Sequence, residues 1–178
     1  MEEQKAKRNI TRMLLILFIV AAAAAIAVIV WALYFRKPEV VLSPDYAPRE
    51  EEPYAEDIPD DSGEKLTSPE GGGSVSITYS RNVSVDLGER RAALHFANPG
   101  KSNQDMVVQI VIRDNVIVQS GTLKPGKQVD SLELLDGAEE QLTEGTYEGG
   151  FNVLYYDPES GEKAVVNTEI PIQITVSE

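Results

Sequence analysis

The spacing of apolar residues divides the chain into regions of different character. Residues 13–35 form an unbroken apolar run of 23 residues without one charged side chain. Residues 36–73 hold few apolar positions, and residues 74–178 alternate apolar with polar positions in short stretches. A long apolar run is typical of a helix that crosses a membrane, whereas period-two alternation is typical of a strand with one buried face. We therefore expect a tail (1–12), a transmembrane helix (13–35), a stalk (36–73) and one folded domain (74–178).

The apolar run has the length and the flanks of a membrane anchor. As a helix rising about 1.5 Å per residue it spans ~35 Å, slightly more than a hydrocarbon core of ~30 Å. Aromatic residues close the run and two basic residues follow it, which suits the interface between lipid and water. These residues are Trp31, Tyr34, Phe35, Arg36 and Lys37.

Charge on either side of the run predicts its orientation. The tail carries four Lys or Arg residues, whereas the opposite flank has two and then becomes acidic. Because Lys and Arg favour the cytoplasmic side, we expect a single-pass plasma-membrane protein with its N-terminus in the cytoplasm and its C-terminal domain outside. A cleaved secretory signal is the alternative, since the alanine run offers cleavage sites. The stretch "VIVWALYF" keeps the chain apolar beyond that run, which favours the anchor over a secreted product.

The next region has the composition of a disordered acidic stalk. It contains six of the ten prolines, and between Pro38 and Gly73 lie eleven Asp or Glu against two Lys or Arg. Such a segment buries too little apolar surface to offset the entropy of its chain. Proline and like charges extend it, so we expect residues 36–73 to be stretched and to end in the loose joint "GGGS".

The remaining 105 residues, 74–178, predict an all-β domain. Short alternating stretches are separated by turn sequences such as "NPGKSN", "KPGK" and "DPESGE", and Asp114-Asn115 suits a two-residue hairpin turn. Pro171 cannot donate to a ladder, so its strand should lie at an edge or bend there. The pattern indicates an antiparallel β-sandwich of about seven strands. We expect strand segments at 75–79, 83–87, 92–97, 106–113, 116–119, 129–134, 147–156 and 164–176.

The stretch "LTEGTY" before the seventh segment resembles the tyrosine corner of immunoglobulin-like and fibronectin type III-like domains. The resemblance implies that Leu142 and Gly145 shape the turn and that Tyr147 bonds its hydroxyl to nearby backbone. It also implies the strand assignment A (split in two), B, C, C′, E, F and G for the segments above. The domain has no tryptophan, although fibronectin-type domains commonly bury one, so the resemblance concerns the architecture and not a characterised family.

Residues for catalysis and metal binding are scarce. The chain has no cysteine and no G-x-S-x-G motif, and its single histidine, His95, lies between two inward-facing positions and should face solvent. We therefore expect no catalytic, cofactor-binding or metal-binding residues, and no enzyme. A small envelope hydrolase is the alternative, because carboxylates are plentiful. Sixteen Asp or Glu against eight Lys or Arg give the domain a net charge of −8, which excludes nucleic acid as a partner.

Three loops should meet at one end of the sandwich, because the strands alternate in direction. They are "NPGKSNQD", "SGTLKPGK" and "DPESGE", and loops held by a rigid sheet are the usual place for contact residues. Their polar side chains and scarce positive charges make them the candidate binding residues. The candidates are Asn98, Lys101, Ser102, Asn103, Gln104, Lys124 and Lys127.

Together these features predict a membrane-anchored binding or structural accessory protein, on a bacterial cell envelope, that displays an Ig-like domain. Its expected partners are the lipid bilayer, through residues 13–35, and a protein or envelope polymer outside the cell. Nothing in the pattern indicates an oligomeric state.

Overall fold

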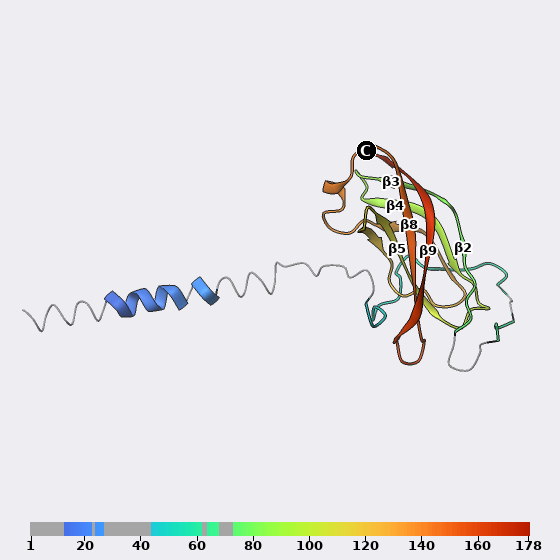
Figure 1. Cartoon of the computed structure of the whole chain (residues 1–178), viewed down its shortest axis with the longest axis horizontal. Helices are drawn as coiled ribbons and strands as arrows, with labels where there is room; N and C mark the ends of the chain where they lie inside the picture. The colour runs from blue at the N-terminus through green and yellow to red at the C-terminus, as the bar shows by residue number, and fades with distance from the viewer. Residues whose placement is uncertain (1–12, 23, 27–43, 62–63, 68–72) are drawn as a thin grey trace, which may run out of the picture. The chain divides into compact units, whose positions relative to one another are not determined.

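The computed structural model describes residues 13–22, 24–26, 44–61, 64–67 and 73–178 (Figure 1). The chain divides into two compact units, Met1–Val40 and Val41–Glu178, and each is described by itself.

In the first unit, residues 13–22 and 24–26 are helical and their side chains are exposed. Within the described part of the chain, no helix is both long enough and apolar enough to cross a membrane. Residue 23 and residues 27–35 of the expected span lie outside the described residues, so the transmembrane helix stays a prediction.

The second unit is built almost wholly of strands. Seven of the eight strand segments expected from the sequence appear as strands over most of their length, whereas only Thr78–Tyr79 of the expected segment 75–79 is a strand. One further two-residue strand, β1, lies in the region expected to be a stalk. The period-two pattern therefore identified the strands of the domain. The strands are β1 (Glu56–Asp57), β2 (Thr78–Tyr79), β3 (Asn82–Asp86), β4 (Arg91–Asn98), β5 (Asp105–Ile112), β6 (Asn115–Gln119), β7 (Lys127–Glu133), β8 (Gly145–Tyr156) and β9 (Lys163–Ser177), with one 3₁₀ helix, η1 (Glu139–Gln141).

The strands pair in the order β1-β7-β4-β3-β9-β8-β5-β6, and β2 adds to β4. Strand β3 joins two layers, because it runs antiparallel to β4 and parallel to β9. At the other side the sheet curls back on itself through a bridge between Val118 and Leu134. The β3–β9 pair is a correction to the expected antiparallel sheet: parity of apolar positions predicts which face is buried but not the direction of the neighbouring strand.

The core lies between these two layers. The rings of Phe96 in β4 and Phe151 in β8 are both fully buried and meet edge-on with centroids 5.7 Å apart. The expected edge position of Pro171 is also found: β9 pairs with β8 along most of its length, but with β3 only from Gln173 onwards. Pro171 therefore lies where the missing N–H costs no ladder bond.

The structure differs from the expected stalk over residues 44–61, which we call the strap. The strap lies against the sandwich and makes backbone hydrogen bonds to it, including Glu52 N to Thr122 O at 3.0 Å and Ile58 N to Gly126 O at 2.9 Å. Strand β1, within the strap, pairs antiparallel with β7. Ala47 packs on a small apolar cluster on the outer face of β5 and β8. Part of the docking uses backbone groups, which a composition does not reveal.

Candidate functional site

The candidate binding residues lie at the end of β4, in the loops that follow β4 and β6, and at the start of β7, and the two loops are fastened to each other. The side chain of Asn98 donates to Gln104 O at 3.0 Å and to Leu123 O at 2.9 Å, and Gly126 N donates to Asn98 O at 2.7 Å. Asn98 is fully buried. Its role is therefore to hold these two loops together, and it presents no surface to a partner.

The next candidates hold the chain that enters the sandwich. The Ser102 hydroxyl accepts from Ser76 N at 2.9 Å and donates to Ser76 O at 3.1 Å, and Ser102 is fully buried. The side-chain oxygen of Asn103 accepts from Ser74 N at 2.7 Å. Gln104 contacts its neighbour, donating to Asn103 O at 3.3 Å. These polar side chains bind their own chain.

The lysines of the loops pair with acids of the strap. Lys124 forms an ion pair with Glu51, and the ammonium of Lys127 lies 2.8 Å from the carboxylate of Asp57. The hydrogen bond and charge of Lys124 lower the pKa of Glu51, and the same contact raises the pKa of Lys124. Lys101 has an exposed side chain. The scarce positive charge that marked these loops in the sequence is thus partly neutralised within the chain.

Glu52 is the buried anchor of the strap, and its sequence context did not mark it. Its carboxylate accepts from Gly121 N at 2.7 Å and from Tyr54 N at 3.1 Å, and the residue is 7% exposed. The strap passes so close to Gly121 that a Cβ there would lie 2.8 Å from Glu52 N. Only glycine allows this approach without a shift of the backbone.

An open hollow of about 530 Å³ lies among the same loops and the residues after the strap. Asp105, the first residue of β5, lines it and is only 8% exposed. Among the described residues none donates a hydrogen bond to the Asp105 carboxylate, and burial raises its pKa. The ammonium of Lys65, which also lines the hollow, donates to Ser102 O at 2.7 Å. The remaining lining residues are Asn103, Lys124, Pro125 and Pro158.

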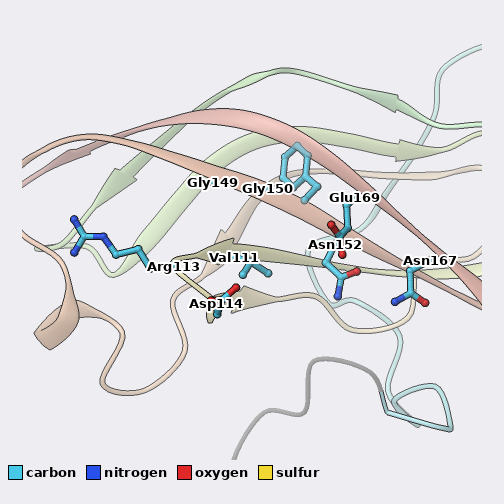
Figure 2. A pocket seen from close by; sticks show the side chains of 9 residues that line it. Val111, Arg113, Asp114, Gly149, Gly150, Asn152, Asn167 and Glu169 are labelled. Atoms are coloured by element: carbon cyan, nitrogen blue, oxygen red, sulfur yellow. The ribbon is translucent and has the colours of Figure 1, made fainter.

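A second hollow, of about 410 Å³, lies on the outer face of β5, β8 and β9 (Figure 2). Gly150 leaves it without a side chain on this face of β8, and Asn152, Asn167 and Glu169 stand around it. Amide side chains continue across the sheet, since Asn152 donates to Gln109 at 2.8 Å and Gln109 to Gln119 at 2.7 Å. The sequence did not mark this face because adjacent strands bring together residues that are far apart in the chain.

The turn beside this hollow lies one residue earlier than expected. Arg113 and Asp114, and not Asp114 and Asn115, occupy the two central positions, with φ of 50° and 66°. Figure 2 shows Arg113 pointing away from the other labelled polar side chains, and its guanidinium lies 5.7 Å from the centre of the Tyr147 ring.

The residues of the expected tyrosine corner lie in one turn. The Tyr147 hydroxyl donates to Thr143 O at 2.9 Å, accepts from Thr143 N at 3.1 Å and lies 3.0 Å from the Thr143 hydroxyl. The hydrogen bonds with the side chain and then the backbone of Thr143 lower the pKa of Tyr147. Leu142 is buried, and Gly145 has a φ of 146°, which favours glycine.

His95 lies on an exposed strand face, as its place between Leu94 and Phe96 predicted. Its Nδ1 is 2.7 Å from the carboxylate of Asp130 on the neighbouring strand β7. In the parts of the chain that the structure describes, no group of three or more His, Cys, Asp or Glu is placed to hold a metal ion.

Comparison with known proteins places the chain in no family. No protein-family model matches it, and no curated protein matches it. AggA, the major subunit of aggregative adherence fimbriae type I from Escherichia coli, is 10% identical, with 65% of this chain and 100% of that chain covered and a TM-score of 0.32. The CooA pilin subunit from enterotoxigenic Escherichia coli is 13% identical, with 59% and 99% covered and a TM-score of 0.26. Scores this low carry no argument about function.

Proposed function

We propose that the chain is a single-pass membrane protein that displays an Ig-like sandwich outside the cell, as a binding or structural accessory module of a bacterial envelope. Residues 13–35 anchor it, with the N-terminus in the cytoplasm. The Ig-like assignment is supported by the strand order and by the first strand, which is split between β2 on one layer and β3 joining the two.

The observation that carries the proposal is the docked strap. An anchored domain on a free stalk of 38 residues could reach ~130 Å from the membrane at ~3.5 Å per residue. In the structure residues 44–61 are docked on the sandwich by backbone hydrogen bonds such as Glu52 N to Thr122 O, so this part of the expected stalk belongs to the displayed domain and adds nothing to that reach.

The docked strap also limits the surfaces on which an external partner can bind. Most polar side chains of the loop end are used within the chain, and the hollow beside Asp105 and the outer face of β5, β8 and β9 are the surfaces that we propose for a partner. Binding sites of small ligands are typically hollows of a few hundred Å³ with a few convergent polar groups, and both hollows meet that description.

Single cysteines test the anchor and its orientation without background, because the chain has none. We expect Ser177→Cys to react with a membrane-impermeant maleimide on intact cells, and Glu3→Cys to react only after permeabilisation. The intact mass of the membrane-extracted protein should include residues 13–35. A mature chain that begins near Ile26 or Val28, or labelling of Glu3→Cys on intact cells, would refute the proposal.

A further inference from the structure

Asp105 is a buried carboxylate that the described residues leave without a hydrogen-bond donor. It begins β5 opposite Tyr156 in the ladder with β8 and is 8% exposed, with its side chain lining the open hollow at the loop end. Its carboxylate borders the open hollow, so its hydrogen bonds come from water or from a ligand that enters the hollow, and not from the described residues. Buried, shifted carboxylates in hollows are candidates for ligand contacts.

Two ammonium groups line the same hollow and favour a ligand of the opposite charge. Lys65 donates to Ser102 O at 2.7 Å, and Lys124 pairs with Glu51. An ammonium has three N–H donors, so one such contact leaves each lysine able to bind an acceptor of a ligand. Burial raises the pKa of Asp105, whereas Lys124 and Lys65 lower it, and the neighbouring acids Glu51 and Asp157 raise it further.

The two kinds of charge together select the ligand. A simple cation would be attracted by Asp105 but repelled by the lysines. A simple anion would be attracted by the lysines but repelled by Asp105. A compact group with an N–H donor at one end and an acid at the other satisfies both. The Asp105 carboxylate needs a donated hydrogen, so a quaternary ammonium does not suffice.

We propose that the hollow beside Asp105 binds a zwitterionic group, with a primary ammonium donating to Asp105 and a carboxylate or phosphate accepting from Lys65 and Lys124. This deepens the proposed function, since it rests on the sandwich being a binding module and names the class of ligand. An amino-acid terminus and the phosphoethanolamine headgroup of a lipid share this chemistry.

Thermal unfolding of the full chain in maltoside micelles tests the proposal, because this detergent has no zwitterionic headgroup to compete. A ligand that binds only the folded state raises the unfolding midpoint as its concentration rises. We expect glycine and phosphoethanolamine to raise the midpoint of the sandwich. Phosphocholine, ethylammonium and acetate, at matched ionic strength, should leave it unchanged.

Variants assign the effect to the hollow. Asp105→Asn should abolish the shift, and Lys65→Gln should weaken it at least tenfold in ligand concentration. Glu148→Gln is the matched control: it removes an exposed acid of β8 that lines neither hollow, and it should keep the full shift. Asp105→Asn is expected to fold, since it removes a buried charge.

The outcomes separate the alternatives. A shift with ethylammonium equal to that with glycine would show a simple cation site, and an equal shift with acetate would show a simple anion site. A shift that is unchanged in Asp105→Asn would show that the ligand binds elsewhere. Each of these results would overturn the proposal. Vesicles with and without phosphatidylethanolamine, each titrated with glycine, separate the two sources of the chemistry. If the lipid headgroup is the ligand, phosphatidylethanolamine in the vesicles should reduce the shift of the unfolding midpoint that glycine produces. An equal shift in both kinds of vesicle would show that the ligand is a soluble molecule. Because micelles have no sidedness, failure of this experiment is distinct from failure of the anchor and its orientation.

Discussion

Replacing Glu52 by alanine should release the strap while leaving the sandwich folded. The carboxylate accepts two backbone N–H groups, from Gly121 at 2.7 Å and Tyr54 at 3.1 Å, and the residue is 7% exposed. Hydrogen bonds to a charged group contribute about 1.5–3 kcal/mol each. Tyr54 is exposed, so in the variant water can accept the hydrogen bond of its backbone N–H. Most of the lost docking free energy therefore comes from the backbone N–H of Gly121. We expect docking of the strap to weaken by about 2 kcal/mol, or roughly 30-fold.

Hydrogen exchange followed by mass spectrometry measures this release directly. In Glu52→Ala, amides of residues 44–61 should exchange roughly 30-fold faster, while those of β5 and β8 should keep their protection, since local openings are independent of global unfolding. Glu50→Ala is the matched control, because it removes a neighbouring acid whose side chain is exposed. Unchanged exchange in the strap would refute the anchoring role of Glu52. Equal acceleration of β5 and β8 would show that strap and sandwich open together, which contradicts a separately docked strap.

Three further substitutions test particular contacts. Asp105→Asn should raise the free energy of unfolding by about 1 kcal/mol at pH 7. Burial raises the pKa of Asp105 in the folded state above the usual 3.8, so the wild-type domain loses stability as the pH rises from 3.8 to the folded-state pKa. The stability gained by Asp105→Asn should therefore vanish below about pH 4, where the carboxyl is neutral in both states. A gain in stability that does not depend on pH would contradict this reasoning. Tyr147→Phe should lower the denaturant midpoint, since its hydroxyl bonds Thr143 N and O, and an unchanged midpoint would make the turn an ordinary one. Gly149→Ala should destabilise the domain by about 1–3 kcal/mol in the same assay, because its Cβ would lie 2.7 Å from Val111 O; a neutral result would show that β8 can shift there.

The strand content of the domain could be read from the sequence with good accuracy. Each stretch that alternated apolar and polar residues became a strand, as in β9, where Ile170, Ile172, Ile174 and Val176 are buried and the residues between them are exposed. A strand has a side-chain period of two, so the pattern states which residues face the core without knowledge of the partner strand. The solvent-facing position of His95 follows from the same parity.

The candidate loops show what a sequence pattern does not determine, namely the partner of each charged side chain. Lys124 and Lys127 were marked because positive charge is scarce in an acidic domain, and the structure pairs them with Glu51 and Asp57. Charge in a sequence indicates that a complementary group is present nearby, but not whether it belongs to a partner or to the same chain. The acidic region expected to repel itself into a stalk supplies that complement.

What the sequence determined by itself was the set of strands, the side of each that is buried, and the division of the chain by composition. The tertiary structure decided the docking of the strap, the hollow beside Asp105, the hollow on the outer face of β5, β8 and β9, and the burial of Asp105 without a hydrogen-bond donor from the described residues. The strap is held in part by backbone N–H and C=O groups, which do not distinguish one residue type from another, by the absence of a Cβ at Gly121, and by side chains whose partners lie far away in the chain, such as Glu52 with Gly121. Among the described residues, the loops, the strap and β8 surround Asp105 without donating a hydrogen bond to its carboxylate. Such surroundings depend on distances between segments far apart in the chain, and no local pattern of residues encodes them.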